Sequence, residues 1–297
     1  MNKRYRPVWL MYALLACITV ANWAALPSSS AEADLRVLHA SMETQLKASV
    51  FHRPIALASE VTPDGLRGDI HAVVDYPFAR VVQGLNGPEQ WCEVMFLHLN
   101  TKYCRASAGR SGKFVTLYVG SKTPQLLSKA TRVVFRYELV QVTPTYLEIK
   151  LSAAEGPMGV SDVRVAFAAV ALANGRTFLR FDYGYAVNPM ARLAVGVYLH
   201  TIGRGKVGFT VTGRDAQGRP SYIDGMRGLV ERNTMRYYLA IDSVLRAATT
   251  ARDAQMDKRE RLWFAAVEEY PLQLHELELA PYLQMKRAEF ARQQTPL

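Results

Sequence analysis

Hydrophobic and polar residues alternate along several segments in the middle of the chain. In residues 132–142, Phe135 and Tyr137 alternate with Arg136 and Glu138, and residues 145–152 and 176–187 follow the same two-residue period. Such a period places successive side chains on opposite faces of a β-strand, so each strand has one charged and one apolar face. The pattern predicts an antiparallel sheet that is covered on one side only.

Turn sequences separate these strands from further short apolar runs. Thr62-Pro63-Asp64-Gly65 is typical of a β-turn and predicts a hairpin between two flanking strands. Asn174-Gly175 is a strong hairpin signal later in the chain. The other predicted strands are 55–61, 66–74, 97–104, 113–120, 161–172 and 206–213. Residues 189–202 fit either a helix or a strand across the end of the sheet.

A period of three to four residues predicts helices toward both ends of the chain. Residues 34–50 have this period, and two short helices are expected at 78–85 and 88–96. A long helix opens near Asp224-Gly225, with its apolar side formed by Met226, Val230, Tyr237, Ile241, Val244 and Ala248. Glu231, Arg232, Arg236 and Arg246 fall outside that stripe. Residues 251–297 form a second, charge-rich helical region, broken at Tyr270-Pro271 and Ala280-Pro281.

The first residues have the features of an export signal. Lys3, Arg4 and Arg6 precede an uncharged run over residues 7–26, and Ala31-Glu32-Ala33 is a small-x-small cleavage site. We therefore expect a signal peptide over residues 1–33, cleaved after Ala33, and a periplasmic or secreted protein. The apolar run is also long enough to span a bilayer, so an uncleaved membrane anchor is the alternative. Leu14-Leu15-Ala16-Cys17 resembles a lipobox, which would instead make the protein a lipoprotein.

Cysteine use and charge agree with an envelope location. Beyond Cys17 the chain holds only Cys92 and Cys104, which an oxidising compartment would join as a disulfide; two buried free thiols are the alternative. The formal net charge is +10, which suits peripheral contact with an anionic membrane; a generally basic surface without such a partner is the alternative. The basic residues are scattered, and exported proteins seldom meet nucleic acid, so no nucleic-acid partner is expected.

The order of the predicted elements resembles the START-like, helix-grip superfamily (SRPBCC), which includes polyketide cyclase/dehydrase-like and lipid-transport proteins. Residues 68–82, GDIHAVVDYPFARVV, look like the opening strand and first short helix of that family. Residues 85–91, LNGPEQW, look like its loop before a tryptophan. The likeness covers about residues 55–250 and implies an α+β fold, in which a curved antiparallel sheet grips a long C-terminal helix. The chain departs from it by an extra N-terminal helix, its paired cysteines and its tail.

The sequence therefore predicts three parts: a signal peptide at 1–33, a helix-grip domain at 34–250 and a C-terminal helical extension at 251–297. Aromatic side chains on the predicted dry face mark a candidate cavity between sheet and helix. Interior tyrosine hydroxyls need hydrogen-bond partners, which a ligand or water in a cavity would supply. The candidate ligand-binding residues are Tyr137, Phe167, Phe181, Tyr183, Tyr185, Phe209, Met226, Asn233 and Tyr237. The resemblance implies a lipid or another apolar small molecule as the ligand.

No motif assigns chemistry to the chain, which has neither GxSxG nor HExxH. Residues 203–208 match GxGxxG, but a strand-like segment follows where a dinucleotide site needs a helix. The histidines occur singly, although His71 and His98 could approach each other across the first and third strands. No catalytic residue, metal or cofactor is therefore expected. Two alternatives to an exported carrier stay open: a cyclase or dehydratase with an inward acid or base, and an interaction protein with a filled core, whose tail docks on a partner or lies over the cavity as a lid.

Overall fold

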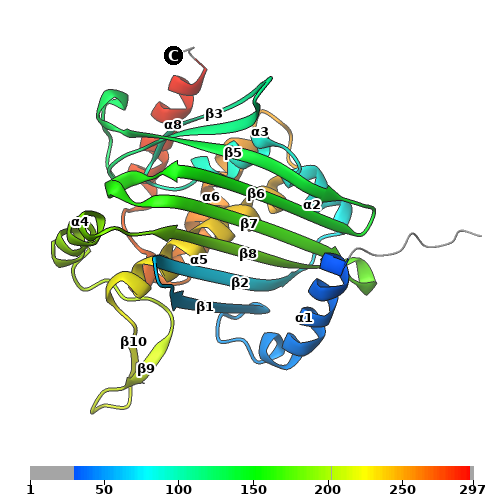
Figure 1. The fold of residues 1–297 in the computed structure, drawn as a ribbon, viewed down its shortest axis with the longest axis horizontal. Coiled ribbons are helices and arrows are strands. Elements are labelled where there is room, and N and C mark those ends of the chain that lie inside the picture. Colours follow the sequence, from blue (N-terminus) through cyan, green and yellow to red (C-terminus); the bar gives the residue numbers. More distant parts are fainter. Residues whose placement is uncertain (1–29, 202, 295–297) are drawn as a thin grey trace, which may run out of the picture.

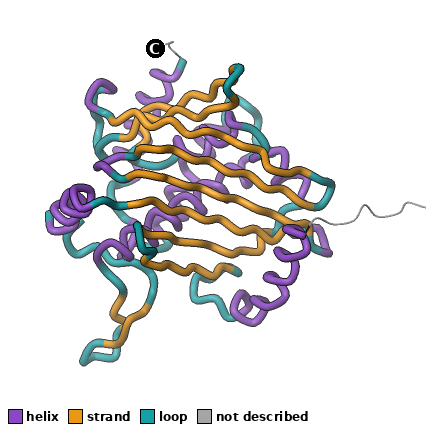
Figure 2. The backbone as a smooth tube through the Cα atoms, in the orientation of Figure 1, coloured by secondary structure: helices purple, strands orange, loops and turns teal. Residues whose placement is uncertain are grey.

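The computed structural model describes residues 30–201 and 203–294, and their central element is a twisted eight-stranded antiparallel sheet (Figures 1 and 2). The strand order is β1-β2-β8-β7-β6-β5-β4-β3. The strands are β1 (Ile55–Val61), β2 (Gly65–Val74), β3 (Thr101–Gly109), β4 (Gly112–Val119), β5 (Thr131–Val142), β6 (Tyr146–Glu155), β7 (Ser161–Ala171) and β8 (Thr177–Ala186). The predicted antiparallel sheet is confirmed, including both hairpins at Thr62–Gly65 and Asn174-Gly175.

Helices cover the sheet behind the strands as Figure 1 shows them. The long helix α5 (Gly225–Ala247) lies against β1, β2 and β8, whereas α2 (Phe78–Leu85) and α3 (Pro88–Phe96) cover β3, β4 and β7. The C-terminal helices are α6 (Gln255–Glu268), α7 (Pro271–Leu274) and α8 (Leu279–Gln293). The predicted α+β architecture, a sheet gripping a long helix, is thus confirmed. The remaining elements are α1 (Ser30–Lys47), α4 (Pro189–His200), β9 (Val211–Arg214), β10 (Pro220–Tyr222) and the short turn η2 (Pro157–Gly159).

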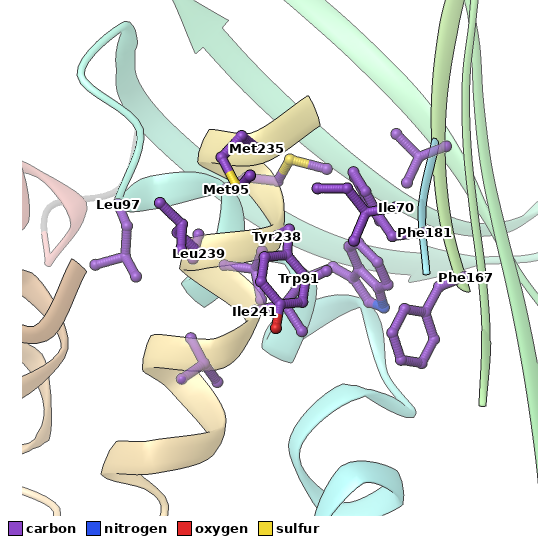
Figure 3. Packing of buried hydrophobic residues seen from close by; sticks show 14 of the residues in the cluster. Ile70, Trp91, Met95, Leu97, Phe167, Phe181, Met235, Tyr238, Leu239 and Ile241 are labelled. Atoms are coloured by element: carbon purple, nitrogen blue, oxygen red, sulfur yellow. The ribbon is translucent and has the colours of Figure 1, made fainter. Parts of the chain in front are cut away.

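The main core fills most of the layer between the sheet and these helices. Figure 3 shows Ile70, Phe167 and Phe181 from the sheet meeting Trp91 and Met95 from α3, and Tyr238 and Ile241 from α5. The rings of Trp91 and Phe167 lie edge to face, with their centroids 6.0 Å apart. Burial of this apolar surface is the main stabilising contribution to the fold.

Helix α5 is buried on both sides, which its amphipathic pattern does not predict. Glu231, Arg232 and Arg236 are at most 2% exposed, although they lie outside the apolar stripe. The C-terminal helices pack on the back of α5, where the Trp263 indole donates a hydrogen bond to the Arg236 carbonyl (3.1 Å). Much of the expected exposed polar side of this helix is therefore buried, because the loop at 207–210 and β1 cover its first half and the C-terminal helices cover Arg236. Arg246, near the end of the helix, is exposed as expected.

The outer face of the sheet is also partly covered, against the expectation of one wet side. Helix α1 packs there through Leu35 and Leu46, and buries Tyr146, Val170 and Phe178. The alternation places Tyr146 on the charged face correctly, but that face is dry where α1 crosses it. The rest of the outer face carries exposed charges such as Arg136, Glu138 and Lys150.

Several element boundaries differ from the predictions. The strand expected at 206–213 is a loop followed by β9, which pairs with β10 in a separate exposed hairpin. Residues 189–200 are helical, and the strand expected at 97–104 begins at Thr101. The second break in the tail lies at 275–278 and not at Ala280-Pro281 as predicted. Pro281 is in the first turn of α8, where a backbone N–H has no partner within the helix, so proline is tolerated there.

The export signal predicted at residues 1–33 lies almost entirely outside the described residues. Helix α1 begins at Ser30, four residues before the predicted cleavage product. Within residues 30–201 and 203–294, no helix combines the length and apolar character needed to cross a bilayer. Cys92 of α3 and Cys104 of β3 form the predicted disulfide, with their Cα atoms 5.5 Å apart. A disulfide agrees with an oxidising compartment.

Candidate functional site

A cavity of about 350 Å³ lies where the N-terminal half of α5 meets α4, η2 and the connection between β4 and β5. Helix α4, which contributes Tyr198 to the lining, lies at the left of the view in Figure 1. Its lining residues are His98, Asn100, Thr101, Val119, Gly120, Ser121, Lys122, Gln125, Lys129, Thr131, Pro157, Met158, Tyr183, Tyr198, Leu229, Asn233, Arg236 and Tyr237. The volume is in the range of small-molecule sites, which bury ligands in clefts of roughly 300–1,000 Å³.

Helix α5 contributes one wall of the cavity through a single face. Leu229, Asn233 and Arg236 are spaced four and three residues apart, so their side chains lie one above another on the helix. Tyr237 follows Arg236 and extends that wall toward β8. The same helix therefore carries an apolar, an amide, a cationic and a phenolic group to one cavity.

Aromatic rings that are tilted against one another line the buried part of the cavity. The ring of Tyr237 lies 5.1 Å from that of His98 and 5.4 Å from that of Tyr183, measured between centroids. Burial raises the pKa of Tyr237 to about 12 and that of Tyr183 well above its usual value. Both phenols are therefore neutral at physiological pH and can donate or accept hydrogen bonds.

His98 is a neutral member of this aromatic group. Burial, assisted by nearby cations of which Arg236 contributes most, holds the pKa of His98 well below its usual value. The backbone N–H of Asn100 donates to its Nδ1 (3.3 Å), so the ring proton resides on Nε2. His98 lies in the turn after α3 and not on the strand predicted at 97–104, which begins only at Thr101.

Cations surround the outer part of the cavity. The carboxylate of Glu276, in the loop before α8, pairs with Lys122 (2.6 Å) and with Arg236 (2.7 Å). Lys129 stands exposed at the rim. None of the lining residues is an Asp or Glu. The polar part of the wall therefore consists of cationic groups and neutral hydrogen-bonding groups.

The structure brings together three of the nine predicted ligand-binding residues, namely Tyr183, Asn233 and Tyr237. Phe167 and Phe181 face the same interior but pack in the filled core. Phe209 packs against Phe51 and Tyr270 from a loop, with ring centroids 5.7 and 5.5 Å away, and not from the sheet as expected. Tyr137, Tyr185 and Met226 also contact the core and are absent from this cavity lining.

Lys122, Tyr198 and Arg236 are lining residues that the sequence analysis missed. Arg236 lies three positions after Asn233, so the helical period contained a usable signal for it. Lys122 comes from the loop after β4 and Tyr198 from helix α4, and the positions of both depend on tertiary packing. His71, expected to approach His98, faces the other side of the sheet, where its ring stacks on Phe178 (6.1 Å) under α1.

No protein-family model matches the chain, and no curated protein matches it. Similar folds are found among solved structures. The human StAR-related lipid transfer protein 5 is 9% identical over 73% of this chain and 97% of its own, with a TM-score of 0.36. The Zhui aromatase/cyclase from a Streptomyces species is 14% identical over 49% of this chain and 85% of its own, with a TM-score of 0.32. Norcoclaurine synthase from Thalictrum flavum is 12% identical over 50% and 77%, with a TM-score of 0.32.

These likenesses concern the fold alone, because the identities and TM-scores are low. The strand order, the two short helices after β2 and the gripped helix α5 define the class: the chain has the START-like helix-grip fold. A fold by itself does not choose between binding and catalysis. That choice depends on the cavity.

Proposed function

We propose that this protein binds and carries a lipid-like or other apolar small molecule in the cavity between α4, α5 and the sheet. The observation that carries the proposal is a cavity whose wall combines aromatic and aliphatic side chains, among them Tyr183, Leu229 and Tyr237, with polar and cationic groups. In ligand sites apolar walls supply affinity and convergent polar groups fix orientation. Buried residues of the main core, such as Phe167, Phe181 and Ile241, fill the sheet–helix layer beside this cavity.

Native mass spectrometry after gentle purification tests the proposal. We expect a bound small molecule, or a one-to-one complex after incubation with a lipid extract. Asn233→Trp fills the cavity from the α5 wall and should abolish the complex. Asn86→Trp, at an exposed position after α2, is the matched control and should leave it intact. A protein that binds no component of any lipid extract would contradict the proposal.

We further propose that the chain is exported, with residues 1–33 removed as a signal peptide. The disulfide between Cys92 and Cys104 supports an oxidising destination. Glu32, just inside the predicted signal, accepts hydrogen bonds from Arg36 and from Thr145 (both 2.9 Å), so cleavage after Ala33 would remove an anchor of α1. The intact mass of the protein, measured in the periplasmic and membrane fractions, distinguishes export from anchoring. A periplasmic chain that begins at Asp34 agrees with export, and a full-length chain in the membrane fraction indicates an anchor.

Helix α4 supports the proposal that the carrier contacts an anionic membrane. Met190, Leu193 and Val197 are 73%, 63% and 57% exposed and recur at helical spacing. Residues 183–214 contain no Asp or Glu but four basic residues, Arg192, Arg204, Lys206 and Arg214. An apolar stripe beside basic residues suits a negatively charged lipid surface, and the inner side of α4 supplies Tyr198 to the cavity wall.

Vesicle co-sedimentation tests this contact. We expect binding to vesicles that contain an anionic phospholipid, weaker binding to purely zwitterionic vesicles, and loss of binding in Leu193→Asp. Val37→Asp, at a 69% exposed position on α1, adds the same charge elsewhere and should have no comparable effect. Equal losses in the two variants would show that α4 is not the docking face.

A further inference from the structure

We infer that the ligand of this cavity is an amphiphile with an anionic head group, a carboxylate or a phosphate, held by Lys122, Lys129 and Arg236. This inference rests on the proposed binding function and adds the chemical class of the ligand. It is based on the excess of cationic side chains in and behind the cavity wall over the carboxylates that pair with them.

The cavity wall contains three cationic side chains and no carboxylate. Of these, Lys122 and Arg236 share the single carboxylate of Glu276, which lies behind the wall. Lys206 lies close to the same group and donates to the carbonyl of His275. Arg232, one turn before Arg236 and 1% exposed, donates to the carbonyl of Val207 (3.2 Å). One carboxylate therefore faces four neighbouring cations, with Lys129 as a fifth at the rim.

Crowding of like charges in a poorly solvated region is unfavourable unless an anion compensates them. Burial, with repulsion from Arg236 as the next cause, lowers the pKa of Arg232 to about 10. Burial also lowers the pKa values of Arg236 and Lys206. The same cations hold the pKa of Glu276 below its usual value, against the effect of its own burial. A ligand anion at Lys122 and Lys129 would relieve this excess of positive charge.

The neutral polar groups of the wall complete a site for an acceptor head group. Tyr198 and Asn233 carry hydrogen-bond donors on the same wall as the cations. The rings of Tyr183 and Tyr237, with Val119 and Leu229, provide apolar surface for a hydrocarbon chain. A purely apolar ligand would leave Lys122 and Arg236 with the shared carboxylate of Glu276 alone, whereas an anionic amphiphile matches both parts of the wall.

Three probes with one hydrocarbon chain separate the head-group chemistries: oleate, oleyl phosphate and oleyl alcohol. We expect one or both anions to bind to the full mature protein at least about tenfold more tightly than the alcohol by isothermal titration below their aggregation concentrations. Lys129→Glu should remove most of that preference, with little change for the alcohol. Lys150→Glu makes the same charge change on the exposed outer face and should keep the preference.

The outcomes distinguish this inference from the proposed function. Equal binding of all three probes, unchanged by Lys129→Glu, would overturn the anionic head group and leave a carrier of neutral ligands. Binding of none of them, together with an empty cavity in native mass spectra, would overturn the binding function itself. Preference for oleate or for oleyl phosphate supports the inference and assigns a carboxylate or a phosphate.

Discussion

Glu231 joins three parts of the chain through one buried carboxylate. It accepts hydrogen bonds from the backbone N–H groups of Phe209 and Thr210 (2.6 and 2.9 Å) and from the hydroxyls of Thr210 and Ser59 (2.6 Å each). Its side chain thereby fixes the loop before β9 and the middle of β1 to α5. Four donors around one carboxylate are enough to offset the cost of burying its charge.

Replacing Glu231 by Gln should destabilise the protein by about 2 kcal/mol or more, because the amide presents donors to the surrounding donors. Urea unfolding monitored by circular dichroism measures the free energy of unfolding. Glu138→Gln on the exposed outer face is the matched control and should change it by less than about 0.5 kcal/mol. Equal stabilities of the two variants would show that the Glu231 hydrogen bonds are dispensable.

Glu260 predicts a specific pH dependence of stability. Burial raises its pKa to about 7, repulsion from Asp257 and Glu289 adds to the shift, and Lys286 and Arg287 oppose it. Because the pKa is higher in the folded state than its ordinary value of 4.5, the stabilisation present at low pH is lost as pH rises toward 7. Relative to Glu260→Gln, the wild-type protein should lose up to about 3 kcal/mol between pH 5 and pH 8.

Urea unfolding of the wild type and Glu260→Gln at several pH values checks this difference. The comparison cancels the contributions of other titrating groups, including that of His98, whose lowered pKa acts in the opposite direction at low pH. A stability difference that does not vary with pH would mean that Glu260 is ionised in the folded protein throughout.

At the scale of elements, the disulfide fastens α3 to β3 at the edge of the sheet. Reduction, or replacement of both cysteines by serine, should lower the free energy of unfolding by about 3 kcal/mol, because it frees a short loop in the unfolded chain. Urea unfolding with and without reductant measures the loss, and the double serine variant should not respond to reductant. A wild-type curve unaffected by complete reduction would contradict the expected stabilisation.

The elements that the sequence predicted best are those whose environment is simple. The inward positions of β5, β6 and β8 follow from alternation, since one buried face determines the strand register. Glu231, Arg232 and Arg236 were expected on an exposed side of α5, because periodicity describes a helix and not what later packs on it. Tyr146 and Phe178 are buried by α1 for the same reason.

The sequence predicted which face of the sheet the candidate site lies on, but not where along that face it lies. Phe181 and Tyr183 lie two residues apart on the same face of β8, yet the first packs in the core and the second lines the cavity. Alternation identifies the face, but where packing leaves space depends on α4 and on the connection between β4 and β5. The position of a helix or a loop in space depends on tertiary packing, which the periodicity of the sequence does not describe.

At the scale of the molecule, residues 251–294 share the core of the sheet–helix layer. Trp263 and Tyr282 are buried in it, and the Tyr282 hydroxyl donates to the carbonyl of Leu97 (3.1 Å). Lys102 of β3, fully buried, pairs with Glu289 of α8 (2.9 Å). Without the tail, Lys102 would keep a buried charge with its ion-pair partner removed.

Truncation after Thr250 should therefore leave a chain without fixed tertiary packing. We expect the near-ultraviolet circular dichroism signal and the cooperative thermal transition to disappear, with much of the secondary structure kept. If the truncated chain kept both, residues 251–297 would instead be an independent extension, free to dock on a partner.

Methyl NMR on the mature protein, titrated with oleate, tests the central claim most directly because it locates the ligand. We predict that signals of Val119 and Leu229 shift with saturable, one-to-one behaviour, whereas those of Ile70 and Ile241 in the filled core stay in place. Shifts confined to the outer face or to α1, or no saturable shift at Val119 and Leu229, would contradict a ligand site between α4, α5 and the sheet.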